Sequence, residues 1–208
     1  MVLPRRYNSD MTAHLQEPTT ARATYEDLEH LPDDVTGELI DGELYASPQP
    51  GGRHSLSTSG IGADIYMAYQ RGRGGPGGWW ILDEPEIHFS LNTLVLVPDI
   101  GGWRRERLQE VQVDHRFTVV PDWICEVLSP STSRLDWAKK LPIYARNGVP
   151  HVWFVDPIAQ TVQVMELTNE QYRFVGIYSG QDKFRALPFE ELEIDLAEIW
   201  PFSGESSS

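Results

Sequence analysis

The chain reads Trp123-Ile124-Cys125-Glu126-Val127-Leu128-Ser129-Pro130-Ser131-Thr132 near its middle. The first six residues form an apolar run, which predicts a strand buried on both faces, and a helix is expected soon after it. A carboxylate such as Glu126 inside a buried strand is costly unless it is paired, protonated or bound to a cation. The stretch therefore predicts both a central strand and a polar site.

A second acidic residue, Asp99, ends another apolar run that begins at Leu94. Asp122 is closer to Glu126 in sequence, but four residues of one strand span about 13 Å. Asp122 and Glu126 therefore cannot share a cation unless the strand bends, whereas Asp99 can lie beside Glu126 on a neighbouring strand. Together with the backbone carbonyl of Val127, the two acids would offer a divalent cation three oxygen ligands. The alternative is structural: Asp99 ends a strand and Glu126 pairs with an arginine.

Size and composition favour a single soluble domain. The chain has 208 residues, 40% of them hydrophobic, and no apolar run of the roughly 18 residues that a membrane span needs. Its start lacks the apolar core of a signal peptide. The single cysteine, Cys125, lies in an apolar run and is expected to be a buried thiol in a reducing compartment. We therefore expect a cytoplasmic protein without a membrane segment.

The net charge of −14 argues against indiscriminate nucleic-acid binding, because phosphate contacts need lysine and arginine. The charge is uneven along the chain. Residues 99–150 hold 8 basic and 7 acidic side chains, a balance of +1, between strongly acidic ends. This central segment contains both Asp99 and Glu126, so a substrate that carries phosphate is compatible with the charge pattern.

Local patterns predict alternating helices and strands. Asp41-Gly42 between short apolar runs predicts a hairpin over residues 38–45, and a helical period predicts a helix over residues 54–71. Strands are expected at 79–83, 86–89, 93–100, 123–128, 151–156, 161–167 and 171–177, helices near 24–28, 135–147 and 192–199, and a glycine-rich linker at 72–78. We expect an arm over residues 1–22, a domain over 23–201 and a disordered tail over 202–208.

Further residues accompany the two acids at fixed spacing. After Glu126 come Ser129–Thr132, Asp136, Lys140, Tyr144, Gly148-Val149 and Val152–Pro157, and before it come Glu38–Glu43, His54 and Pro98-Asp99. Over residues 24 to 200 this pattern resembles a bacterial family known as putative restriction endonucleases, a branch of the PD-(D/E)XK nuclease superfamily. The resemblance implies an α/β (α+β) fold, with a restriction-endonuclease-like mixed sheet flanked by helices in one domain.

The resemblance also implies roles for individual residues. It makes Asp99 and Glu126 the ligands of Mg²⁺ or Mn²⁺, with DNA as substrate. Lys140 corresponds to a lysine that in most of these nucleases stands on the strand, at the position of Leu128. The role that the resemblance gives Lys140 is to stabilise charge on the phosphate or to orient water. The N-terminal acid is Glu38 or Glu43, and Glu43 is preferred because it lies nearer the loop that leads to His54. The full set of candidates is Asp99, Glu126, Lys140, Glu43, the Val127 carbonyl, Glu38, His54 and Tyr144.

Two positions depart from the family pattern. Val97 precedes Pro98-Asp99 where a polar residue is common, and Pro142 falls inside the helix that carries Lys140, where it would kink the chain and could turn the lysine away. We therefore weigh a metal-dependent endonuclease that forms a homodimer against a weakly active or inactive nuclease-fold protein that serves as an interaction module. A third possibility is a homodimeric scaffold that exposes Trp79, Trp80 and Trp103.

Overall fold

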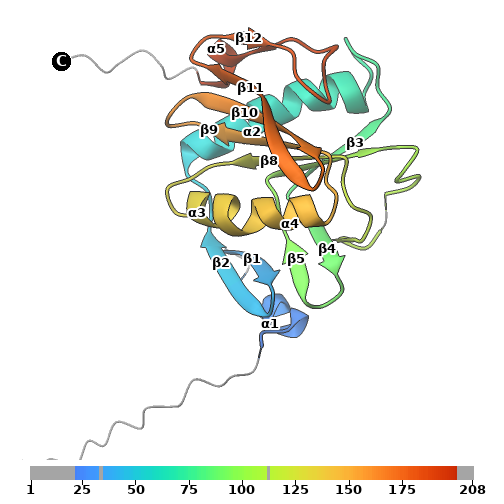
Figure 1. The fold of residues 1–208 in the computed structure, drawn as a ribbon, viewed down its shortest axis with the longest axis vertical. Helices are drawn as coiled ribbons and strands as arrows, with labels where there is room; N and C mark the ends of the chain where they lie inside the picture. Colours follow the sequence, from blue (N-terminus) through green and yellow to red (C-terminus); the bar gives the residue numbers. More distant parts are fainter. Residues whose placement is uncertain (1–21, 33–34, 112, 201–208) are drawn as a thin grey trace, which may run out of the picture.

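The computed structural model describes residues 22–32, 35–111 and 113–200. The expected tail, and the expected arm apart from Arg22, lie outside these residues. The described chain forms two mixed sheets flanked by helices (Figure 1), as the resemblance implied. Among the described residues, no helix combines the length and the apolar character needed to cross a membrane.

The larger sheet has six strands and forms the centre of the domain. Its order is β11 (Gln171–Ser179), β10 (Thr161–Thr168), β9 (His151–Asp156), β8 (Trp123–Val127), β6 (Ile100–Arg104) and β3 (Trp79–Asp83). Only β8 and β9 run parallel, because the chain crosses between them through a helix; all other neighbours in this sheet are antiparallel. The predicted strand containing Glu126 is therefore an interior strand of this sheet.

The smaller sheet has five strands in the order β2 (Glu43–Pro48), β1 (Val35–Ile40), β5 (Leu94–Leu96), β4 (Glu86–Ser90) and β7 (Arg116–Phe117). The predicted hairpin over residues 38–45 is confirmed, since β1 and β2 pair around Asp41 and Gly42, both with positive φ. A short helix, α1 (Tyr25–Glu29), packs on β1, and β12 (Lys183–Phe184) pairs with β13 (Ile194–Asp195) ahead of α5 (Leu196–Ile199).

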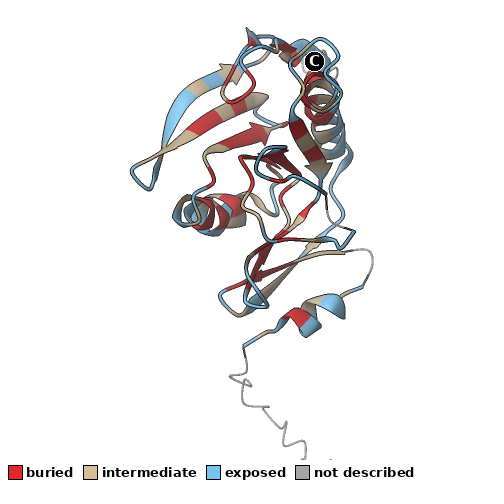
Figure 2. Cartoon of the chain, turned by 90° about the vertical axis from the view of Figure 1, so that its right-hand side faces the viewer, coloured by how far each residue is buried: buried red, intermediate tan, exposed pale blue. Residues whose placement is uncertain are grey.

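Helices cover both faces of the larger sheet. On one face α2 (Gly52–Ile65) and the π-helical turn η1 (Tyr66–Gln70) pack on the strands through Ile61 and Ile65. On the other face α3 (Ser133–Leu135), the π-helical turn η2 (Asp136–Lys140) and α4 (Leu141–Arg146) form one helical crossover that packs through Ile143 and Tyr144. This crossover lies between the two sheets in Figure 1, and Figure 2 shows buried residues concentrated in the strands and on the helix faces turned toward them.

Two expectations about this region were wrong. The predicted strand over residues 93–100 is broken at Val97, Pro98 and Asp99: β5 lies in the smaller sheet and β6 begins in the larger one. Proline cannot donate to a sheet ladder, so the break falls there. The expected exposure of the tryptophans is also wrong, because Trp79 and Trp103 are 3% and 0% exposed in the cores and Trp80 is partly buried.

Candidate active site

Asp99 and Glu126 meet where the two sheets join. Ile100 of β6 pairs with Cys125 of β8, so the residue before Ile100 lies next to the residue after Cys125. Asp99 Oδ2 accepts a hydrogen bond of 2.6 Å from the Val127 backbone N–H, which fixes its carboxylate against the Glu126 strand. Glu126 is 2% exposed, in the interior of the sheet. The break at Pro98 therefore delivers Asp99 to this point.

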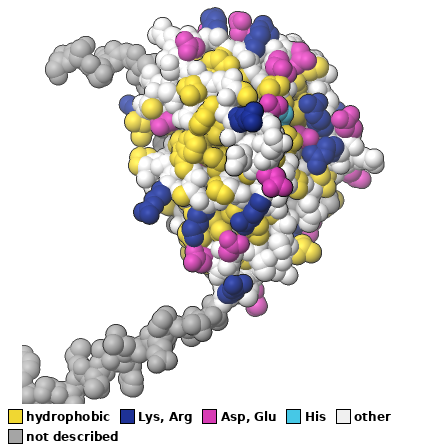
Figure 3. All heavy atoms as spheres, viewed as in Figure 1, with side chains coloured by type: hydrophobic (Ala, Val, Ile, Leu, Met, Phe, Trp, Pro, Cys, Tyr) yellow, Lys and Arg dark blue, Asp and Glu magenta, His cyan; other side chains and the backbone are white. Residues whose placement is uncertain are grey.

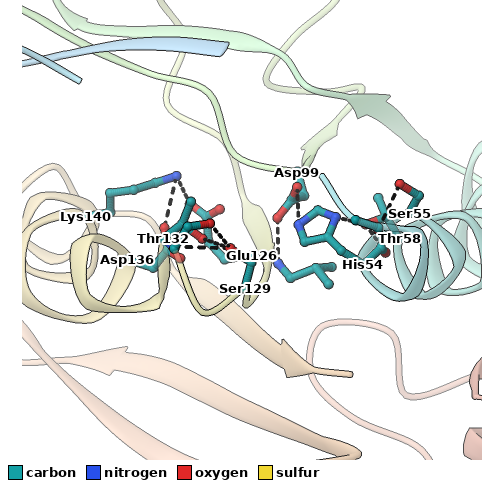
Figure 4. Close-up of polar contacts among 12 residues, drawn as sticks. His54, Ser55, Thr58, Asp99, Glu126, Ser129, Thr132, Asp136 and Lys140 are labelled. Carbon is teal, nitrogen blue, oxygen red and sulfur yellow. Dashed lines mark hydrogen bonds and ion pairs between the residues drawn. The ribbon is translucent and has the colours of Figure 1, made fainter. Parts of the chain in front are cut away.

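Lys140 is the cation of the site. Its Nζ lies 2.8 Å from Glu126 Oε1 and 3.0 Å from Glu38 Oε1, and a third carboxylate, Asp136, has its Oδ1 at 3.4 Å. Lys140 is only 3% exposed, so its ammonium is surrounded by carboxylates and not by solvent. Figure 4 shows the lysine reaching from the crossover toward the acids on one side, with His54 facing Asp99 on the other.

The π-helical turn explains why Pro142 does not turn Lys140 away. In η2 the Leu141 N–H bonds to the Asp136 carbonyl five residues back, and Pro142 stands at the start of α4, where it needs no N–H partner. The wider turn keeps Asp136, Lys140 and Tyr144 on one side of the helix. The kink that the sequence led us to expect is thus absorbed as a π turn, and Lys140 points into the site.

The N-terminal acid in the cluster is Glu38, and the preference for Glu43 needs correction. Glu38 is 5% exposed, and its Oε1 contacts Lys140 and accepts the Val97 N–H at 2.9 Å. Glu43 is the first residue of the edge strand β2, next to the hairpin turn, where it is exposed and pairs with Lys139 at 2.9 Å. The hairpin register points both side chains to the same face of the sheet, so the face does not distinguish them. Glu38 lies on the interior strand β1, which also pairs with β5, whereas Glu43 lies on the edge strand β2, and proximity along the loop to His54 could not reveal this.

His54 and Tyr144 each hold one of the acids. His54, near the start of α2, places Nε2 3.1 Å from Asp99 Oδ1, and the fully buried Tyr144 donates its hydroxyl hydrogen bond to Glu126 Oε1. Both residues therefore position carboxylates. Asp122, the acid of the other Pro-Asp pair, does not contact the cluster residues. It accepts a hydrogen bond from the Arg104 N–H at 2.8 Å and pairs with Arg107.

Burial and crowded charge shift the protonation of the cluster. Burial, reinforced by the nearby carboxylates, raises the pKa of Glu126 well above its usual range, although Lys140 opposes the shift. Burial alone would lower the pKa of Lys140, but Glu126 and Glu38 more than reverse this and raise it. For His54 the cost of burial is outweighed by Asp99 and by the Val127 carbonyl, so its pKa is raised too. Lys140 therefore stays charged, while burial favours the protonated forms of Glu126 and Asp136.

A cavity of about 100 Å³ opens onto these residues. Glu38, Asp99, Glu126, Asp136, His54 and Lys140 all line it, together with hydroxyls of the loop after β8. No group of three or more His, Cys, Asp or Glu side chains is arranged to hold a metal ion as it stands, within the residues that the structure describes. The type of donor nevertheless fits: four carboxylates face one lysine and one histidine, and hard oxygen ligands suit Mg²⁺ or Mn²⁺.

Comparison with known proteins agrees with this geometry. The sequence profile of the Uma2 family, described as "Putative restriction endonuclease", matches residues 22–197. The chain belongs to this family. Its fold is similar to the crystal structure of a putative nuclease belonging to DUF820 from Anabaena variabilis, with a TM-score of 0.69 and 24% identity over 86% of this chain and 97% of that chain. No curated protein sequence matches.

Asp136 also belongs to the cluster, although the sequence pattern did not single it out as a site residue of this member of the restriction endonuclease family. It is 3% exposed, and burial raises its pKa while Lys140 opposes the shift. Its position four residues before Lys140 was the available signal, because residues at that spacing share a helix face. Ser129, whose hydroxyl contacts those of Ser131 and Thr132 at 2.9 Å, lines the entrance beside it.

Proposed function

We propose that the protein is a divalent-metal-dependent endonuclease that hydrolyses DNA phosphodiester bonds at the Asp99–Glu126–Lys140 cluster. The observation that carries the proposal is the contact of the Lys140 ammonium with Glu126 and Glu38 beside Asp99, at a cavity open to solvent. Membership of the restriction endonuclease family supports the same reaction class. A purely structural ion pair does not require two further carboxylates in contact with the same lysine.

The residues divide into metal ligands and positioning groups. Asp99, Glu126 and the Val127 carbonyl would hold Mg²⁺ or Mn²⁺. A divalent cation bound there supplies Lewis-acid activation of the phosphate and of water. Lys140 contributes a fixed positive charge that stabilises the negative charge developing on the phosphate oxygens or orients the attacking water. Glu38 holds the Lys140 ammonium in place, and the exposed Glu43 takes no part.

His54 and Tyr144 act through the acids that they touch. The imidazole of His54 contacts Asp99 Oδ1 and so orients this carboxylate. Tyr144 donates a hydrogen bond to Oε1 of Glu126. Because the carboxylate is planar, this contact also helps to orient Oε2. The two residues therefore set where the ligand oxygens point before substrate arrives.

We place this activity in the cytoplasm, in a homodimer that acts on DNA. The fully buried free thiol of Cys125 suits a reducing compartment. The acidic surface implies that DNA binding depends on local contacts at the site and is sensitive to salt.

The test is cleavage of supercoiled plasmid with Mg²⁺ or Mn²⁺ at low salt. The full chain should nick or linearise the plasmid, and Asp99→Asn and Glu126→Gln should each abolish cleavage. Asp122→Asn is the matched control, because it alters the other Pro-Asp pair outside the cavity; it should keep activity once circular dichroism shows that it is folded. Cleavage that persists in both site variants would exclude the proposal.

The second candidate is a nuclease-fold protein that binds the cation but cuts poorly. The observation that favours it is the burial of Lys140, whose ammonium is already occupied by three carboxylates. Titration calorimetry with Mn²⁺ separates the two. Binding that Glu126→Gln abolishes, without plasmid cleavage by the intact chain, would identify this second function.

A further inference from the structure

One edge of the larger sheet lacks the protection that the other sheet edges carry. Edge strands invite pairing with another chain, and proteins block them with short strands, prolines, charges or a covering element. The β3 edge is covered by η1, where Gln70 accepts the Ile81 N–H at 2.7 Å. In the smaller sheet β7 has two residues, and β2 begins with Glu43 and ends with Pro48.

The unprotected edge is β11, the longest strand among the described residues. Its nine residues contain no proline and a single charge, Arg173, which lies opposite Glu166 of β10. Within the part of the chain that the structure describes, no strand pairs with its outer side. A bulge makes Val175 an extra residue on this strand, between Phe174 and Gly176, but the extra residue is apolar and adds no charge.

The same strand exposes large apolar side chains. Phe174, Val175 and Ile177 are 54%, 45% and 62% exposed. Figure 3 shows hydrophobic side chains gathered on the face where Figure 1 draws β9, β10 and β11. At about 150–200 Å² per fully exposed large side chain, these three leave roughly 300 Å² of apolar surface uncovered.

We propose that β11 is the interface through which two copies of this chain pair, antiparallel, into a homodimer with one continuous sheet. A standard interface buries about 800 Å² per partner, a little over half of it apolar, and the three exposed side chains of β11 supply about two thirds of that apolar share. The partner that pairs with β11 is a second copy of the chain. A two-fold axis beside β11 places the β11 strands of two copies antiparallel to each other, and both copies then make the same contacts.

The charges of the strand agree with a two-fold axis near Val175. Antiparallel pairing about that residue places Arg173 of one copy opposite Ile177 of the other. The two arginines then stand about 13 Å apart along the strands, each beside the Glu166 of its own chain. In a chain with a net charge of −14, this nearly neutral edge is where two copies can approach with little repulsion.

The experiment measures the mass of the full chain by sedimentation velocity at fixed salt, without metal or DNA. The intact chain should be a dimer at tens of micromolar, and Ile177→Asp should raise the dissociation constant at least tenfold. Leu91→Asp, at a 65% exposed residue in the turn before β5, is the matched control and should leave it unchanged within twofold. A monomer at all concentrations, or a dimer that Ile177→Asp leaves intact, would overturn the proposal.

A second variant gives a positive signal. With the axis near Val175, paired backbones bring the two copies of this residue within the Cα separation of a disulfide, about 4.4–6.8 Å. Mild oxidation of Val175→Cys should produce a covalent dimer, whereas Leu91→Cys should not; the native Cys125 is fully buried. A Val175→Cys chain that stays monomeric on reducing-agent-free gels counts against the interface. This proposal rests on the homodimer of the proposed function and names its interface. Because the mass is measured without substrate, a loss of nuclease activity and a loss of the dimer are observed separately.

Discussion

Replacing Lys140 with methionine should destabilise the protein strongly. The substitution keeps most of the aliphatic stem but removes the ammonium that lies 2.8 Å from Glu126 and 3.0 Å from Glu38. Removing one partner of a buried ion pair leaves a buried charge uncompensated and typically costs about 3–5 kcal/mol. Because a cluster of acids loses its only lysine here, we expect a value in the upper half of that range at pH 7.

The assay is urea unfolding followed by tryptophan fluorescence, with the free energy of unfolding compared between variants. Lys139→Met is the matched control, since the neighbouring lysine pairs with an exposed Glu43 and its loss should cause little measurable change. The cost at Lys140 should shrink at pH 5, because the acids that lose their partner take up protons. Equal stability of the two methionine variants at pH 7 would refute the assignment of Lys140 as the compensating charge.

Three further predictions concern the other residues of the cluster. Glu38→Gln should lower plasmid cleavage at least a hundredfold and Glu43→Gln should leave it within twofold; equal losses in initial-rate assays would remove Glu38 from the site. His54→Gln should lower the free energy of unfolding by about 1–2 kcal/mol at pH 5 and by less at pH 8. Asp99 raises the pKa of His54, so the histidine contributes its full stabilisation below about pH 6.5 and loses it as pH rises through the raised pKa. The urea midpoints of the variant and the intact chain should therefore converge as pH rises, and midpoints that do not converge would contradict the sign. Mn²⁺ affinity should rise with pH, by at most tenfold per pH unit, because burial raises the pKa of Glu126 and this carboxyl group must lose its proton to bind. Calorimetry that shows no proton release would argue against Glu126 as a ligand.

The sequence predicted those parts of the fold that depend on local chemistry. The hairpin at Asp41-Gly42, the amphipathic helix and the central strand each have a signal within a few residues. The strand β6 was missed because it begins with Ile100-Gly101-Gly102, and glycine is a poor strand former. Its glycines make sense only in the assembled sheet, where a side chain at Gly101 would meet the Trp103 ring and Pro85 at 2.8 Å.

The candidate site was predictable to the extent that it lies in buried strands. Asp99 and Glu126 could be selected because charge in an apolar run is unusual and strand spacing excluded Asp122. Choosing between Glu38 and Glu43 required knowing which strand of the hairpin pairs with β5, the strand that leads to Asp99, and this is a tertiary property. The orientation of Lys140 depended on a π turn beside Pro142, and spacing alone predicted a kink there.

The cluster draws its charges from β1, β8 and the crossover, segments that are far apart in the chain. A chain that has emerged only as far as β8 holds Glu38 and Glu126 without their shared lysine. These acids can therefore become buried together only after the crossover has formed and packed between the two sheets. Contacts between segments as distant in sequence as β1 and the crossover slow folding. The two sheets are consequently joined into one cooperative unit by the same ion pairs that prepare the site for chemistry.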